Sequence, residues 1–276
     1  MKLEKLHNVK IAIITSNDQT FLLPTWAKTI KFLKKKNISL RGVFISRKEM
    51  TNLKPKKLYF WYLKTFGIKN FVLLTIFTLF TKVIRQIRKF PSSFEDLSKK
   101  NNIPFFYLKN CKQKNFIKWI KEKKIDILLI TTQDILKKKL IKSVKKGIIN
   151  KHASILPNSR GLLPFFWNVI NNKEQGVTYH VISEKIDSGK MLLQKKIKKK
   201  NISMIGYYLK IFNQYPRDIY QSLKIIYKIN NKNCFKKKIV SSYNSIPKKK
   251  DFITFKKKGG KIILLRDFIN ALYFNK

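Results

Sequence analysis

Short apolar runs alternate with amphipathic segments along most of this chain. The runs have the length and β-branched content of buried strands, and they lie at 10–15, 40–46, 103–108 and 125–131. Apolar residues at helical spacing predict helices between and after them, at 25–36, from 92–95 to about 101–102, at 115–123 and at 136–145. A further strand, 146–152, is entered through a glycine. This alternation predicts an α/β fold: a Rossmann-like, mainly parallel sheet with helices on both faces.

Residues 53–90 interrupt the alternation with two apolar runs, 59–62 and 71–80. Only eleven uncharged residues separate Asn70 from Lys82, whereas a bilayer-spanning helix needs roughly 20 apolar residues. We therefore expect no transmembrane segment. Two interpretations of 59–90 stay open: a pair of helices packed on the core or in a homodimer interface, and a surface that makes peripheral contact with a membrane.

After residue 200 the regular alternation of strand and helix patterns ends. Residues 204–227 read as an amphipathic helix that Pro216 is expected to kink or split. Strand-like pieces follow near 238–243 and 261–265. We therefore expect a first domain at 1–200, with a helical insertion at about 53–90, and a small α+β extension at 201–276.

The chain is strongly basic, with 62 Lys and Arg against 14 Asp and Glu and a net charge of +48. Only seven of the basic residues are arginine, the side chain that proteins favour for reading phosphates and bases. The lysines are scattered through nearly every segment. We therefore interpret the charge as a general field that attracts anionic substrates, and not as a dedicated nucleic-acid surface.

Composition bounds the protein class further. The 44% hydrophobic content is typical of a globular chain and excludes a disordered one. Cys111 and Cys234 stand alone without metal-ligand spacing, which favours reduced thiols in a cytoplasmic protein. No apolar signal-peptide region precedes the first predicted strand. No metal site is expected.

Polar groups suited to catalysis gather in one stretch. Asn150 and His152 alternate on the predicted strand and should project into one cleft. The amide of Asn150 can stabilise a developing oxyanion, and the imidazole of His152 can move a proton near neutral pH. Asp187, close to Gly189, would orient that imidazole and favour its charged form. We interpret Asn150, His152 and Asp187 as candidate catalytic residues for acyl transfer.

The nucleophile for such a reaction is expected to belong to the substrate. The chain has no Gly-x-Ser-x-Gly elbow, and neither cysteine lies near the motif. A lone histidine is more often structural than catalytic. We accordingly interpret His180 as a structural or supporting residue and His7 as inert.

Residues 147–194 resemble the folate-dependent formyltransferases, which include glycinamide ribonucleotide formyltransferase, methionyl-tRNA formyltransferase and the sugar N-formyltransferases. The shared pattern is Asn-x-His-x-Ser-Leu-Leu-Pro, then Arg-Gly, Gly-Val-Thr-x-His and Asp-x-Gly. In this chain the pattern is carried by Asn150, His152, Ser154, Pro157, Arg160, Gly161, Gly176, Val177, Thr178, His180, Asp187 and Gly189. Weaker likeness extends back to Lys10 and forward to about Phe255.

The resemblance implies an enzyme that transfers a formyl group from 10-formyltetrahydrofolate to a free amine, with 1–200 as its catalytic domain. It implies that Asn150 binds the formyl oxygen, that His152 stabilises the oxyanion and relays a proton, and that Asp187 orients His152 and helps to remove the proton. Two loops are expected to hold the pterin. They contain the cofactor-binding candidates Gln133, Asp134, Ile135, Leu136, Glu184, Lys185 and Ile186. Asp134 and Lys151 depart from the family's common residue types.

The expected acceptor is a nucleotide-linked amino sugar used in surface polysaccharide. Arg160 is a candidate to bind its phosphate or carboxylate, the alternative being that it only fixes the turn before Gly161. A tRNA acceptor is possible but disfavoured, because the 76 residues after position 200 are fewer than the barrel domain of methionyl-tRNA formyltransferases requires. Hydrolysis of the formyl donor and a non-enzymatic basic binding protein remain as alternatives.

Overall fold

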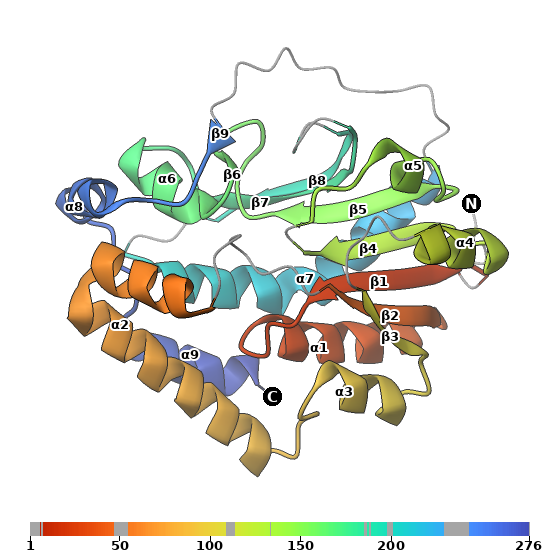
Figure 1. Cartoon of the computed structure of the whole chain (residues 1–276), viewed down its shortest axis with the longest axis horizontal. Helices are drawn as coiled ribbons and strands as arrows, with labels where there is room; N and C mark the ends of the chain where they lie inside the picture. The colour runs from red at the N-terminus through yellow and green to blue at the C-terminus, as the bar shows by residue number, and fades with distance from the viewer. Residues whose placement is uncertain are drawn as a thin grey trace.

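A seven-stranded sheet with the order β3-β2-β1-β4-β5-β7-β8 forms the centre of the molecule (Figure 1). The computed structural model describes residues 6, 8–46, 55–108, 114–132, 134–184, 187, 189–197, 201–228 and 243–275. The strands are β1 (Ile11–Ser16), β2 (Leu40–Ser46), β3 (Phe105–Leu108), β4 (Ile127–Thr131), β5 (Gly147–His152), β7 (Gly176–Val181) and β8 (Met191–Lys196). The first five are parallel, whereas β7 and β8 are antiparallel to their neighbours. The α/β, mainly parallel sheet predicted from the sequence is confirmed.

Alternation along the strands separates two apolar cores. In β1, Ile11 and Ile13 face one core, while Ala12 and Ile14 face the other. This division follows from the two-residue period of a strand. Because both faces are buried, the strands read as continuous apolar runs instead of alternating ones.

Helices cover both faces of the sheet, as expected. The larger core lies under α1 (Leu22–Lys34), α3 (Phe94–Lys100) and α7 (Met204–Lys228). The smaller core lies under α4 (Lys114–Glu122) and α5 (Lys138–Ile141). Three further helices are α6 (Pro164–Ile170), α8 (Lys249–Lys257) and α9 (Leu265–Phe274). A two-stranded sheet pairs β6 (Arg160–Gly161) with β9 (Tyr243–Asn244).

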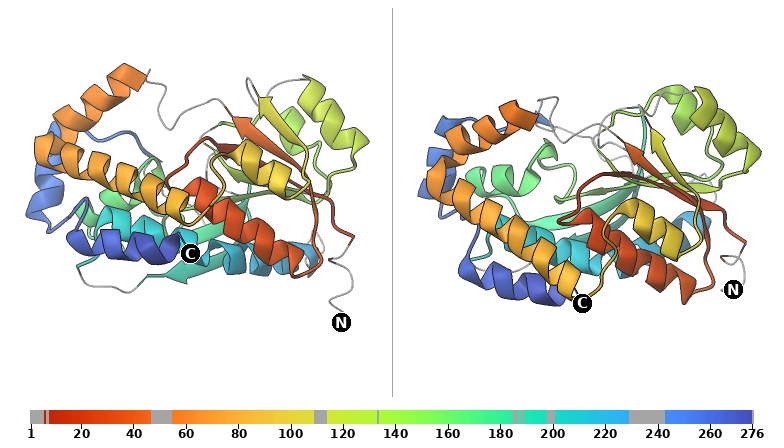
Figure 2. Two further views of the ribbon diagram at one scale, coloured as in Figure 1. Left: turned by 90° about the horizontal axis from the view of Figure 1, so that it is seen from below. Right: turned by 60° about the horizontal axis from the view of Figure 1, so that its bottom comes forward.

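The insertion between β2 and α3 is a long helical element, α2 (Pro55–Ile87), with a non-helical break at Gly67. Its second part runs beside α9 on the outside of the molecule (Figures 1 and 2). Among the described residues, one helix, Lys56–Ile87, is long and apolar enough to cross a membrane by length and composition alone. The uncharged run between Asn70 and Lys82 is too short to span a bilayer, but the helix and its apolar positions continue on both sides of these two residues.

Two of the predicted helices are present, but they begin at other residues than the sequence indicated. Ser93, not Ser92, is the N-cap of α3: its hydroxyl accepts the N–H of Asp96 at 3.0 Å. Asp96 in turn accepts the N–H of Ser92 at 2.8 Å. The helix predicted at 136–145 is shortened to α5, which begins at Lys138.

Two expectations for the C-terminal part were wrong. Helix α7 continues through Pro216, so the missing N–H does not split it. The buried face of α7 packs against α1 and the sheet, which holds the helix together across that position. Residues 261–264 form no strand; they lead into α9, where Asp267 accepts the N–H of Leu264 at 2.7 Å. The piece predicted at 238–243 lies outside the described residues except for Tyr243. The domain boundary near residue 200 stays a prediction.

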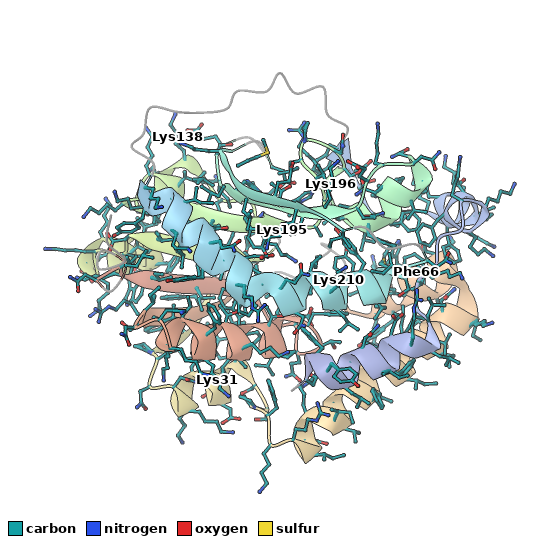
Figure 3. All side chains as sticks on the ribbon, turned by 180° about the vertical axis from the view of Figure 1, so that it is seen from behind. Lys31, Phe66, Lys138, Lys195, Lys196 and Lys210 are labelled. Atoms are coloured by element: carbon teal, nitrogen blue, oxygen red, sulfur yellow. The ribbon has the colours of Figure 1, made fainter. Side chains whose placement is uncertain are left out.

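Lysines extend from many elements. In Figure 3, Lys31 of α1, Lys138 of α5, Lys196 of β8 and Lys210 of α7 are spread over separate parts of the molecule. Some are paired: Lys196 lies 2.9 Å from Glu174, and Lys138 lies 3.3 Å from Glu184. The positive charge is therefore spread over the surface, as the scattering of lysines along the sequence predicted.

Candidate active site

The site is built on strand β5 and its antiparallel neighbour β7. Asn150 and His152 share the side chain direction of Ile148, which belongs to the smaller core, so both point to one face of the sheet. The register places Asn150 directly opposite His180. The amide nitrogen of Asn150 lies 3.5 Å from Nε2 of His180, at the outer limit of a hydrogen bond.

Asp187 reaches the same place from the loop between β7 and β8. Its Oδ2 lies 3.5 Å from Nδ1 of His152, and its Oδ1 lies 3.6 Å from Nε2 of His180. The backbone N–H of Gly161 donates to Oδ2 at 3.2 Å. One carboxylate therefore contacts both imidazoles, and all three side chains are nearly removed from solvent.

Glycine is required at position 189 for this loop to close. A Cβ atom there would lie 1.6 Å from the carbonyl oxygen of Val181, a distance no packing can accommodate. Asp187 itself has a positive φ of 47°, a conformation that Asp tolerates better than most residues. The Asp-x-Gly motif is therefore a backbone requirement of the turn that presents the carboxylate.

The hydrogen bonds of the two histidines fix their tautomers. A carbonyl oxygen can only accept, so Nε2 of His152 donates to Ser159 at 2.9 Å, and Nδ1 of His180 donates to Val181 at 3.2 Å. In the neutral rings, the lone pair of His152 Nδ1 then faces Asp187, and the lone pair of His180 Nε2 faces the amide of Asn150.

Burial and charge set opposite protonation states for the central pair. Burial lowers the pKa of His152, and the negative charge of Asp187 opposes this only in part. Burial alone would raise the pKa of Asp187. The hydrogen bond with His180, the positive charge that His152 carries when it is protonated at acidic pH, and the N–H of Gly161 outweigh burial and lower that pKa from 3.8 to about 2. At neutral pH the site therefore holds a neutral imidazole beside an ionised carboxylate.

The segment after β5 is held by a polar network. The hydroxyl of Thr178 donates to the carbonyl of Ser154 at 2.7 Å and accepts the N–H of Leu156 at 3.1 Å. Gln194 of β8 donates to the hydroxyl of Thr178 at 2.9 Å and to the carbonyl of Leu156 at 3.0 Å. The Leu156–Pro157 peptide bond is cis. The Ser and Thr of the motif are thus structural supports of the site.

Two of the seven predicted cofactor-binding residues line a concavity of about 550 Å³. Leu136 and Glu184 line it, together with Ile117 and Leu140. Ile135 is exposed beside it, with 60% of its surface accessible. The carboxylate of Asp134 accepts the hydroxyls of Ser46 and Thr132, which anchors the loop after β4. Gln133, Lys185 and Ile186 lie outside the described residues.

Two basic residues near the motif have different surroundings. Arg160 lies on β6, where it pairs with Tyr243 of the C-terminal part. Lys151 points to the opposite face of the sheet from Asn150 and His152, with its ammonium 3.6 Å from the ring centre of Phe212 in α7. Burial lowers the pKa of Lys151 to about 7, against the opposing charge of Asp18.

His180 is the residue whose position the sequence left open. The structure places it against both Asn150 and Asp187. Its place in the Gly-Val-Thr-x-His pattern was the available signal. The antiparallel register that brings it opposite Asn150 could not be read from the chain.

Comparison with known proteins finds similarity to one family around this site. Residues 82–202 match the family model described as formyl transferase. A methionyl-tRNA formyltransferase from Clostridioides difficile (strain 630) is 32% identical over 138 residues, which cover 49% of this chain and 45% of that protein. The match therefore spans less than half of this curated relative's length.

Solved structures resemble the chain over more of its length. A sugar N-formyltransferase from Shewanella sp FDAARGOS_354 has a TM-score of 0.55 at 16% identity, covering 90% of this chain and 87% of that one. A 4-N formyltransferase from Francisella tularensis has a TM-score of 0.53 at 19% identity, covering 96% of this chain and 87% of that one. At such identities the likeness shows a shared fold. Asn150, His152 and Asp187 all lie inside residues 82–202, the segment that matches the formyl transferase family model.

Proposed function

We propose that this protein transfers a formyl group from 10-formyltetrahydrofolate to a primary amine of a small-molecule acceptor, a nucleotide-linked amino sugar. The formyl transferase family uses formyl-tetrahydrofolate as its co-substrate. The observation that carries the proposal is the convergence of an amide, an imidazole and a carboxylate from β5 and the β7–β8 loop.

Asn150 supplies the electrostatic part of the reaction. One N–H of its amide faces His180, and the second is available to a carbonyl oxygen. Negative charge develops on that oxygen when an amine attacks the carbonyl carbon. An amide donor already held in place stabilises this charge without reorganising, an effect worth roughly a hundredfold or more in rate.

His152 and Asp187 divide the proton transfer. The amine must lose a proton as its new C–N bond forms, and neutral His152 can accept that proton at Nδ1. The proton then lies between Nδ1 and Oδ2 of Asp187, which is already ionised because its pKa is about 2. The same imidazolium can return the proton to the departing nitrogen of the donor, so no net proton is left on the protein.

The concavity beside Leu136 and Glu184 supports a place for the folate next to this site. It combines apolar walls with backbone segments at the carboxyl ends of β4 and β7, where ligands of open α/β sheets bind. We assign Asp134, Ile135, Leu136 and Glu184 to this contact as part of the proposal.

The acceptor is proposed from the extent of the two kinds of likeness. The fold resembles a sugar N-formyltransferase across 90% of this chain and a 4-N formyltransferase across 96%. The alignment with a methionyl-tRNA formyltransferase covers only 45% of that protein. A net charge of +48 favours an anionic acceptor, and Arg160 is the residue we assign to its phosphate or carboxylate.

The test is an assay of formyl transfer by mass spectrometry. The full chain is incubated with 10-formyltetrahydrofolate and a panel of aminosugar nucleotides, and we expect a formyl mass gain on one of them. His152→Ala should abolish this turnover. Asn171→Ala, an exposed substitution at the end of α6 that removes none of the residues assigned to the site, should leave it unchanged.

Other outcomes distinguish the rival functions. Formylation of charged initiator tRNA, falling steeply with salt, would replace the sugar by tRNA as the acceptor. Loss of the donor without any amine would indicate hydrolysis. Absence of thermal protection by folate would count against every folate-dependent activity and favour a basic binding protein.

A further inference from the structure

Helix α2 presents an apolar row to solvent. Every third or fourth residue of its second part is apolar and exposed, and Ile68 and Ile87 at the two ends are 72% and 71% accessible. The row consists of Ile68, Val72, Ile76, Leu79, Val83 and Ile87. At about 3.6 residues per turn these positions share one side of the helix over roughly 30 Å. Isolated exposed apolar side chains are ordinary in proteins, but a continuous row marks an interaction site.

The opposite side of the same helix is buried in the protein. Phe77 packs against Phe268 of α9 at 5.4 Å, and Phe66, just before the break at Gly67, packs edge-on against Phe252 of α8 at 5.4 Å. Thr81 is also buried. A helix anchored in this way along one side cannot be surrounded by lipid, so its length does not make it a membrane-spanning helix here. It can lie along a surface with its free side downward.

Helix α9 extends the apolar row into a wider face. Phe268 also contacts Phe80 of α2 at 5.4 Å, and the guanidinium of Arg88 donates to the carbonyl of Leu272. Residues three and four apart are neighbours on a helix surface. Phe80 therefore lies next to the apolar row of α2, and Phe268 lies next to an exposed row on α9. The α9 row consists of Leu265, Ile269 and Tyr273. We call the two rows together the α2–α9 face.

The charged residues of α2 have one sign. No acidic residue occurs between Glu49 and Glu95, so the whole of α2 lacks a carboxylate. Exposed basic residues of α2 and of the turn after it are Lys56, Lys57, Lys64, Lys69, Lys82, Arg88 and Lys89. Such a surface complements a negatively charged partner. A second copy of this chain is a poor occupant, because each copy carries a net charge of +48.

We propose that the α2–α9 face docks this protein onto an anionic lipid surface, with the apolar rows inserted among the acyl chains and the lysines at the headgroups. Apolar insertion and attraction to anionic headgroups together give stable, reversible binding that neither gives alone. The proposal concerns where the protein works and does not depend on which amine it formylates.

The test must separate insertion from simple charge attraction. The full chain is sedimented with vesicles of phosphatidylcholine alone and with vesicles that also contain phosphatidylglycerol. We expect binding to the anionic vesicles only. The variant Ile76→Ser/Leu79→Ser/Val83→Ser keeps the net charge, and we expect its binding to fall roughly tenfold or more, because three apolar side chains no longer leave water. Leu265→Ser/Ile269→Ser, on the other helix, should weaken binding in the same direction.

Matched charge variants supply the second half of the test. Lys64→Gln/Lys69→Gln/Lys82→Gln removes three charges beside the face, and Lys114→Gln/Lys121→Gln/Lys123→Gln removes three exposed charges at α4, across the sheet. We expect the first to reduce vesicle binding more than the second. Equal losses, or undiminished binding of the serine variants, would overturn the proposal in favour of unspecific charge attraction.

Sedimentation velocity tests whether a second copy of this chain, and not a lipid surface, covers the α2–α9 face. We expect the wild-type chain to stay a monomer across the concentration range used with vesicles. A dimer that the serine variants convert to monomer would show that a second copy covers the face, and it would overturn the lipid proposal. Circular dichroism and thermal melting of each variant confirm that the fold is retained, since all substituted side chains are exposed.

Discussion

Asn150 and His180 face each other across the antiparallel pair β5–β7, with the amide nitrogen of one 3.5 Å from Nε2 of the other. In the neutral ring of His180, Nδ1 donates to a backbone carbonyl, which leaves Nε2 as an acceptor for the Asn150 amide. The pair therefore fixes which way the Asn150 amide points. An oxyanion donor is effective only when its direction is set before the charge appears.

His180 is therefore predicted to act as a positioning residue. His180→Ala should reduce kcat for formyl transfer roughly tenfold to a hundredfold while changing KM much less, since the amide loses its orientation and the acceptor site is untouched. His180→Gln, whose side-chain oxygen can still accept, should recover part of kcat. A change in KM alone would show that His180 contacts substrate instead.

The Asp187 carboxylate should contribute to stability in a defined pH range. Its pKa falls from 3.8 to about 2 on folding, so the stabilisation is present above pH 3.8 and is lost as the pH falls toward 2. Asp187→Asn should therefore lower the free energy of unfolding at neutral pH by about 2 kcal/mol. Urea unfolding of both proteins at neutral and acidic pH measures this, and a difference that stays constant down to pH 2 would contradict it.

Lys151, in contrast to Asp187, should lower the stability of the folded protein at neutral pH. Its pKa falls from 10.5 to about 7 on folding, chiefly because of burial, so the folded state is penalised while the lysine is charged. Stability should rise with pH between 7 and 10.5, where the unfolded chain binds the extra proton. Lys151→Met should consequently raise the melting temperature most below pH 7, and the gain should shrink toward pH 10.5. A variant less stable at every pH would show that the contact with Phe212 outweighs burial.

The turn that carries Asp187 should not tolerate a side chain at position 189. Gly189→Ala places a methyl group against the carbonyl of Val181 and must displace the turn. We expect formyl transfer to fall by at least the factor seen for Asp187→Asn. Gly259→Ala is the control: Gly259 has a positive φ of 76°, but a Cβ atom there meets no atom within 4 Å. It should cost about 1 kcal/mol of stability and leave kcat intact.

The apolar pattern of the chain was sufficient for the five parallel strands and for the fold class, whereas β7 and β8 were not predicted. Strand β2 lies at the residues predicted, and the strand that carries Asn150 and His152 differs by one residue. Buried parallel strands produce continuous apolar runs because both faces are covered, and that signal is local. The shared direction of Asn150 and His152 is equally local, since it follows from the two-residue period of one strand.

The pairing of distant segments was decided only by the folded chain. Asp187 reaches His152 because an antiparallel pair and a glycine turn bring its loop back over β5, and the opposition of Asn150 and His180 depends on that same register. The outward direction of the α2 row could not be predicted either, because α2 is apolar on two sides. Periodicity shows that a side of a helix is apolar. Which side the rest of the protein covers is a property of the packing.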